Sequence, residues 1–213
     1  MPARHDELAA LAEPLRVRLD AATAAREKGL AAARRTIQAS SKSIRAVHRQ
    51  DWAEAAALGD EAATHLREAQ DALAPFPALA ASGPLHDAAK EYAEARLTLA
   101  LAADRALASP TDLGISDQSW LNGLAEAASE LRRHLLDRLR DGQFDVAERL
   151  LAAMDEVYAL LVTVDYPDAL TGGLRRTTDA LRPVLERTRG DLTTTFLQQR
   201  LQSALERRLD ASD

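Results

Sequence analysis

Lys90-Glu91-Tyr92-Ala93-Glu94-Ala95 opens a long apolar stretch, which continues as Leu97-Thr98-Leu99-Ala100-Leu101-Ala102-Ala103. This composition predicts a helix that is apolar on nearly every side, and such a helix lies buried. Glu91 and Glu94 are three residues apart, so their carboxylates share one face of that helix. Because an unpaired buried charge costs several kcal/mol, a cation or a proton must compensate these two acids.

A second acidic pair follows downstream. Glu126 and Glu130 are four residues apart on a helix that we expect to begin near Ser119-Trp120. Four carboxylates on two facing helices would form an all-oxygen site, which suits hard divalent ions such as Mg²⁺ or Mn²⁺. An acid cluster with arginines nearby fits phosphodiester hydrolysis, because a metal activates water while arginines hold the flanking phosphates.

Other interpretations of these acids stay open or lose support. The same Glu spacings occur on solvated faces of helices rich in Ala, Leu, Glu and Arg, so the acids could be surface charges only. No histidine follows a glutamate by three residues, which disfavours the di-iron helical bundles. The chain also lacks a G-x-S-x-G nucleophile motif and a phosphate-binding P-loop.

The composition predicts an all-α protein. Alanine, leucine, arginine and glutamate dominate and favour helices, and 213 residues suffice for one good core, so we expect a single domain over residues 1–213. Cysteine is absent, which excludes disulfides, zinc thiolates and thiol nucleophiles. We find neither a membrane-length apolar window nor an apolar signal core, so we expect a cytoplasmic protein without a membrane partner.

Apolar periodicity and turn signals predict seven helices. In chain order they cover about residues 6–49, 52–74, 83–108, 117–141, 145–165, 168–189 and 191–209. Tyr166-Pro167 breaks the fifth helix, and Gly190-Asp191 separates the sixth from the seventh.

Three of these helices carry apolar stripes. The first has Leu8, Leu11, Leu15 and Leu19; the fifth has Val146, Leu150, Met154, Val157 and Leu161; the seventh has Leu192, Phe196, Leu201, Leu205 and Leu209. Together they offer more apolar surface than one small bundle needs, which favours a homo-oligomer.

The formal net charge of −6 excludes a simple basic footprint for nucleic acid. Arginine nevertheless supplies all but three of the 27 basic residues, and arginine is the better phosphate ligand. Its clusters are the candidates for nucleic-acid binding: Arg45, Arg49, Arg132, Arg133, Arg175 and Arg176. For the arginine bias as a whole, we prefer a GC-rich genome as the explanation over selection for phosphate binding.

The C-terminal third resembles the prokaryotic branch of the translin family. The resemblance rests on Met154-Asp155-Glu156-Val157-Tyr158, Asp165-Tyr166-Pro167-Asp168-Ala169-Leu170, Gly172-Gly173-Leu174-Arg175-Arg176 and Thr188-Arg189-Gly190-Asp191. Ser41-Lys42 with His48-Arg49 is similar to the first-helix motif of that family. Lys90 to Ala95 resembles the Gln-Glu-Tyr-Val-Glu-Ala element of translin-associated factor X, the catalytic branch. Trp120 to Glu126, with Glu130, is similar to its next acidic helix.

This resemblance implies a seven-helix translin-like bundle and a hollow, roughly octameric shell, with or without a paralogous subunit. It also implies a Mg²⁺- or Mn²⁺-dependent endoribonuclease that acts on single-stranded RNA inside the shell. Glu91, Glu94 and Glu126 would be the catalytic, metal-binding acids, with Glu130 as a fourth ligand. One departure is that the third acid is Asp in the eukaryotic catalytic subunit and Glu126 here.

Two other functions remain as alternatives. The first is an oligomer that binds single-stranded RNA or DNA without cutting it. The second is a helical scaffold whose acids are surface charges. Metal-dependent cleavage of labelled RNA separates the nuclease from both.

Overall fold

The computed structural model describes residues 4–81 and 83–210, in which nine helices and no strand occur. The six long helices are α1 (Arg4–His48), α2 (Trp52–Leu73), α4 (Gly83–Ala102), α6 (Asp117–Arg140), α7 (Phe144–Val162) and α9 (Leu174–Asp210). The three single-turn helices are α3 (Pro77–Ala80), α5 (Pro110–Leu113) and α8 (Asp168–Thr171). The all-α prediction is confirmed. Within these residues, no helix combines the length and the apolar character that a bilayer span requires.

Three predicted helix boundaries are wrong. α9 continues through Gly190 and Asp191, because one helical glycine costs only about 1 kcal/mol and Leu185 and Leu192 are buried on either side. α4 ends at Ala102, six residues early, where Asp104 turns the backbone at φ 55°. A single turn, α8, stands at the start of the predicted sixth helix and ends at Gly172. Six long helices and three single turns therefore replace the predicted seven.

Small residues let the first helices pack closely. The buried face of α1 is built from alanines and hydroxyl residues, among them Ala32, Ala39 and Ala46, and it packs against α2 and α4. The core between α6, α7 and α9 is built from larger side chains such as Leu135 and Leu150. The predicted packing role of α7 is confirmed, because Leu150, Met154, Val157 and Leu161 are all buried.

Gly123 brings α6 against the acid-bearing turn of α4. A Cβ atom at this position would lie 2.6 Å from the Cβ of Ala93, 2.8 Å from the carbonyl oxygen of Lys90 and 2.9 Å from the amide nitrogen of Glu94. Real Cβ atoms do not approach the backbone this closely, so only glycine fits here. The contact places Glu126, one turn further along α6, beside Glu91 and Glu94.

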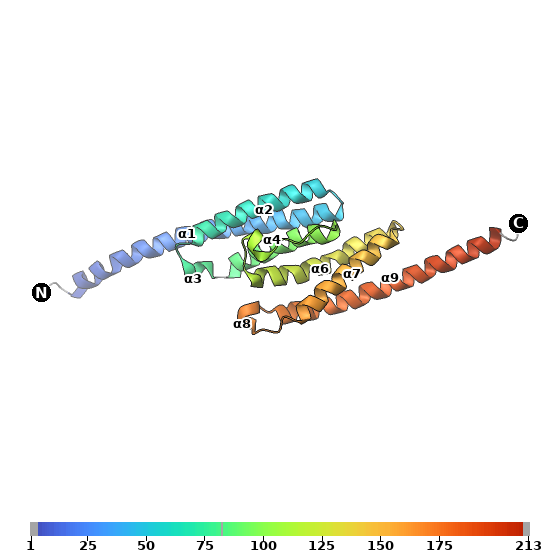
Figure 1. Cartoon of the computed structure of the whole chain (residues 1–213). Helices are drawn as coiled ribbons and strands as arrows, with labels where there is room; N and C mark the ends of the chain where they lie inside the picture. Colours follow the sequence, from blue (N-terminus) through green and yellow to red (C-terminus); the bar gives the residue numbers. More distant parts are fainter. Residues whose placement is uncertain (1–3, 82, 211–213) are drawn as a thin grey trace.

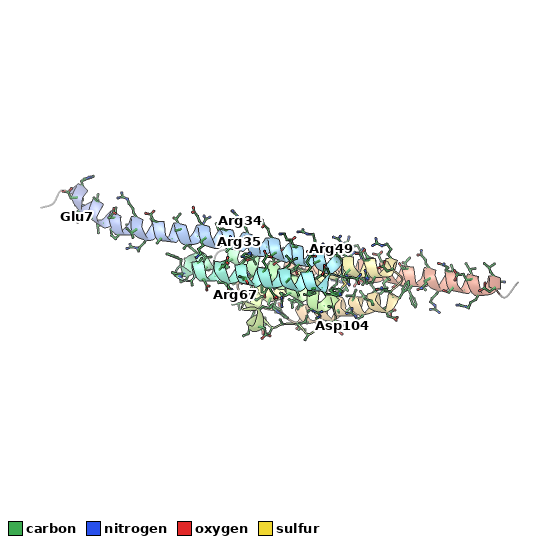
Figure 2. The ribbon with its side chains drawn as sticks, turned by 90° about the horizontal axis from the view of Figure 1, so that it is seen from above. Glu7, Arg34, Arg35, Arg49, Arg67 and Asp104 are labelled. Carbon is green, nitrogen blue, oxygen red and sulfur yellow. The ribbon has the colours of Figure 1, made fainter. Side chains whose placement is uncertain are left out.

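Two helical arms extend beyond the packed body, at opposite ends of the molecule (Figure 1). The N-terminal arm is residues 4–28 of α1, with Glu7 labelled near its free end (Figure 2). The C-terminal arm is residues 197–210 of α9, which follow the contact of Phe196 with Phe144 of α7. The predicted stripe on the first helix lies on the N-terminal arm, where Leu11 and Leu19 are 62% and 66% exposed. The accessible surface of 12,701 Å² exceeds by about 3,000 Å² the area that a compact monomer of this mass exposes.

Candidate functional site

The acidic pairs predicted from the sequence meet in one open pocket of about 600 Å³. Its walls come from the last turns of α1, the middle of α4 and the middle of α6. We call it the acidic pocket; its lining residues are Ser41, Ile44, Arg45, His48, Lys90, Glu91, Glu94, Glu126, Ser129, Glu130 and Arg133.

Three carboxylates converge in this pocket. One oxygen each from Glu91, Glu94 and Glu126 lies within 4.8 Å of the others. Opposite ligands of an octahedral Mg²⁺ lie about 4 Å apart, so small side-chain rotations would let the three groups share one ion. The donor set is all oxygen, as Mg²⁺ and Mn²⁺ prefer.

Lys90 lies among these acids. Its Nζ donates a hydrogen bond to Glu126 Oε1 at 2.7 Å and lies 3.9 Å from Glu91 Oε1. Burial opposes the charge of Lys90, but the bond to Glu126 and the neighbouring carboxylates outweigh it and raise the pKa of Lys90. The ammonium group is therefore a counterion for two of the three acids.

Glu94 is the most buried of the acids, with 8% of its surface exposed. Burial, followed by repulsion from Glu91, Glu126 and Glu130, raises the pKa of Glu94 to about 8. Burial also raises the pKa of Glu91. The sequence predicted that a cation or a proton must compensate this pair. The structure supplies the cation, which is the ammonium of Lys90, and the raised pKa of Glu94 favours its protonated form.

Glu130 lies in the pocket wall but outside the convergent group. Its Oε2 pairs with Nε2 of His48, which ends α1, at 2.9 Å. The His48 side chain is only 6% exposed, and its Nδ1 has no hydrogen-bond partner among the residues that the structure describes. The structure thus gives the two members of the predicted Glu126/Glu130 pair different partners, Lys90 and His48.

The predicted arginine clusters divide between several surfaces. Arg45 and Arg133 line the acidic pocket. Arg132 faces the neighbouring groove and is bound to α9, at 3.0 Å from the Thr188 hydroxyl and 2.7 Å from Asp191 Oδ2. Arg49, exposed at the end of α1 (Figure 2), pairs with Glu54 of α2.

Arg175 lies in a different pocket, of about 400 Å³, between α7, α8 and α9. We call it the C-terminal pocket; Tyr158, Asp165, Tyr166, Asp168 and Asp179 are also in its wall. Arg176 is exposed on the same turn of α9. The structure therefore does not bring the Arg175-Arg176 pair together with the acidic pocket.

Two pocket residues had no clear signal in the sequence. Lys90 is adjacent to Glu91, and neighbours on a helix do not face one another, so its contact with Glu126 depends on the packing of α4 on α6. His48 lies 82 positions before Glu130. Its place in the first-helix motif was the only available hint.

No protein-family model matches the chain. Over 138 residues it is 30% identical to an uncharacterized protein of Methanocaldococcus jannaschii. The match covers 64% of this chain and 61% of that protein, so the aligned part spans about three fifths of the relative.

Solved structures match more of the chain. The crystal structure of AfC3PO is 32% identical, with a TM-score of 0.81 over 87% of this chain and 97% of that one. AfC3PO in complex with duplex RNA is 31% identical, with a TM-score of 0.69 over 87% and 96%. Apo-NeC3PO is 19% identical with a TM-score of 0.72 over 92% and 98%, which shows a shared fold. C3PO is the complex of translin and TRAX.

Proposed function

This chain belongs to the translin family, and we propose that it is a metal-dependent endoribonuclease that cuts single-stranded RNA inside a hollow homo-oligomeric shell. The observation that carries the proposal is the convergence of Glu91, Glu94 and Glu126 within 4.8 Å, in a pocket that also contains two unburied arginines. Support for an RNA ligand comes from the AfC3PO structure that contains duplex RNA.

The residues of the pocket have separate tasks in this proposal. Glu91, Glu94 and Glu126 hold the Mg²⁺ or Mn²⁺ ion, with Glu130 nearby. A bound ion supplies Lewis-acid activation of water and neutralises charge on the reacting phosphate. Arg45 of α1 and Arg133 of α6 would hold the phosphates on either side of the cleaved bond.

His48 and Glu130 complete the wall. The imidazole of His48 is buried, and its Nε2 shares a hydrogen bond with Glu130 Oε2 at 2.9 Å. It therefore fixes that carboxylate beside the three converging acids. The pocket is open to solvent, so an extended strand can enter it without unfolding the protein. Single-stranded RNA as the substrate follows from the family resemblance.

In this proposal the two helical arms form the contacts between the subunits of the oligomer. Leu8, Leu11, Leu15 and Leu19 on one arm and Leu197, Leu201, Leu205 and Leu209 on the other are all at least half exposed. Large exposed apolar faces of this kind pack against another chain. We propose that the arms join about eight copies, as the family resemblance implies.

Cleavage assays test the nuclease. Labelled single-stranded RNA and a duplex of the same sequence are incubated with the protein and Mg²⁺, Mn²⁺ or EDTA. We expect internal cuts in the single strand that require the metal and slower cutting of the duplex. Activity that survives EDTA contradicts the metal site.

A second function, RNA binding without cleavage, is favoured by one observation. Lys90 already pairs with Glu126, so the acids have an internal cation. Retention of RNA that weakens with salt, combined with no cleavage in either metal, selects this function.

Light scattering tests the assembly. We expect a mass several times the 23.1 kDa of one chain, and a lower mass for a variant with Leu201→Glu and Leu205→Glu. A stable wild-type monomer at micromolar concentration contradicts the shell.

A further inference from the structure

The position of Lys90 has a consequence for the ion that the pocket binds. We propose that Lys90 is the resident cation of the acidic pocket, and that a divalent ion reaches Glu91 and Glu126 fully only after the Lys90 ammonium has left them. This inference rests on the proposed metal site. It makes Lys90 a positioning residue that sets the affinity of the pocket for metal.

The first support is the contact geometry. Nζ of Lys90 lies 2.7 Å from the same Glu126 side chain that contributes an oxygen to the convergent group, and 3.9 Å from Glu91. The Lys90 side chain is 23% exposed and those of its two partners are 31% and 33% exposed. The ammonium therefore lies close to both acids, and the Lys90 side chain is mostly removed from water, unlike a surface lysine.

The second support is the conflict between two cations. A metal bound to Glu126 at about 2.1 Å would lie within about 5 Å of an ammonium that kept its present hydrogen bond to that carboxylate. Like charges at this separation repel, and in a half-buried pocket salt screens that repulsion poorly. One of the two cations must leave.

The third support is that Lys90 can leave at low cost. Its four-carbon side chain is flexible, and the pocket wall that it occupies opens to solvent. Asp87, one turn earlier on α4, is exposed and lies on the same face at a spacing of three residues. It offers the displaced ammonium another carboxylate.

Titration calorimetry with Mn²⁺, without RNA, tests this exchange. The variants are Lys90→Gln, which removes the charge, and Lys90→Arg, which keeps it. Lys28→Gln is the matched control, because Lys28 is an exposed lysine of α1. Melting curves in EDTA and in Mn²⁺ accompany each titration.

We expect Lys90→Gln to bind Mn²⁺ about tenfold more tightly than wild type. Removal of one nearby like charge changes the logarithm of a binding constant by about one unit or more. Lys90→Arg and Lys28→Gln should bind as wild type does. In EDTA the melting temperature of Lys90→Gln should fall, because Glu91 and Glu126 lose their counterion; in Mn²⁺ it should recover. The strongest support would be Mn²⁺ binding by the Lys90→Gln variant and none by the wild-type protein.

Two results overturn the inference and are distinguishable. Equal Mn²⁺ affinity in wild type and Lys90→Gln leaves the metal site intact and removes the competing role of Lys90. Absence of Mn²⁺ binding in both proteins removes the metal site of the proposed function and the inference with it.

Discussion

The acidic pocket and the C-terminal pocket are both lined by several carboxylates with basic side chains among them, and they differ in burial. The first has four carboxylates with Lys90, Arg45 and Arg133; the second has three carboxylates with Arg175. In the C-terminal pocket, Asp165, Asp168 and Asp179 are all exposed. In the acidic pocket, Glu94 is 8% exposed and its partners are half-buried.

We infer that desolvation, together with the convergence of the carboxylates, separates the proposed metal site from a charged surface. Water stabilises the aspartates of the C-terminal pocket, so their charges require no other partner. Around Glu94 the protein has replaced that water, and the pKa of Glu94 rises to about 8. A buried carboxylate that resists ionisation is suited to bind a cation, because the cation stabilises the negative charge in place of the lost water.

The largest expected effect concerns cleavage. Glu91→Gln, Glu94→Gln and Glu126→Gln keep side-chain size and remove an anionic oxygen, so each should lower the RNA cleavage rate by about 100-fold or more. Asp165→Asn and Asp179→Asn, in the C-terminal pocket, should cut as wild type does. Single-turnover assays measure both sets. Equal losses in the two pockets would mean that burial does not distinguish them.

The second effect concerns stability against pH in metal-free protein. The folded pKa of Glu94 is raised, so between its ordinary pKa and about 8 the folded state holds a proton that the unfolded state has lost. Stability therefore falls as pH rises through this window and levels above pH 8. From pH 6.5 to 8 the loss should be on the order of 2 kcal/mol.

Glu94→Gln should remove this slope and melt several degrees higher than wild type at pH 8. Asp179→Asn is the matched control and should leave the slope unchanged. Melting curves in EDTA from pH 6.5 to 9 measure it. The lower limit avoids His134, whose pKa burial lowers to about 4 and which destabilises the fold only in acid. A flat wild-type profile would show that Glu94 is better solvated than its burial indicates.

The third effect concerns the contact that creates the burial. Gly123→Ala places a methyl group 2.6 Å from the Cβ of Ala93, which should cost about 1–3 kcal/mol and separate α6 from α4. Manganese affinity should fall together with stability. Gly190→Ala, in open space on α9, should instead stabilise slightly. Thermal melts and Mn²⁺ titrations of both variants measure these effects. A Gly123→Ala variant that melts like wild type would mean that α4 and α6 lie further apart than in this structure.

The smallest effect concerns RNA affinity. Arg45→Gln and Arg133→Gln should each flatten the salt dependence of single-stranded RNA binding by about one unit, because each removes one phosphate contact. The sequence predicted the same for Arg175 and Arg176, which the structure places at the C-terminal pocket and beside it. Binding titrations at several salt concentrations compare the pairs. A larger change for Arg175 and Arg176 would assign the RNA path to the C-terminal pocket.

The sequence alone predicted the helical class and the three converging acids, Glu91, Glu94 and Glu126, with Glu130 as a fourth that lies outside the group. Helix-favouring composition and periodicity are local properties, so α1, α2, α6 and α7 could be placed within a few residues. Glu91 and Glu94 share a face through helical geometry, and their apolar neighbours predicted burial. The wrong helix boundary at Gly190 has a physical reason as well. The low helix propensity of one glycine costs little free energy, and the packing of buried leucines along α9 contributes more.

Only the tertiary structure decided how charges pair across helices. Which acid receives Lys90 and which receives His48 depends on the close approach of α4 and α6 at Gly123 and on where α1 ends. Those contacts join residues 36 and 82 positions apart, and no helical period reaches so far. Burial of Glu94 likewise arises from three helices meeting around it, because the water that a carboxylate loses is set by its neighbours in space and not by its neighbours along the chain.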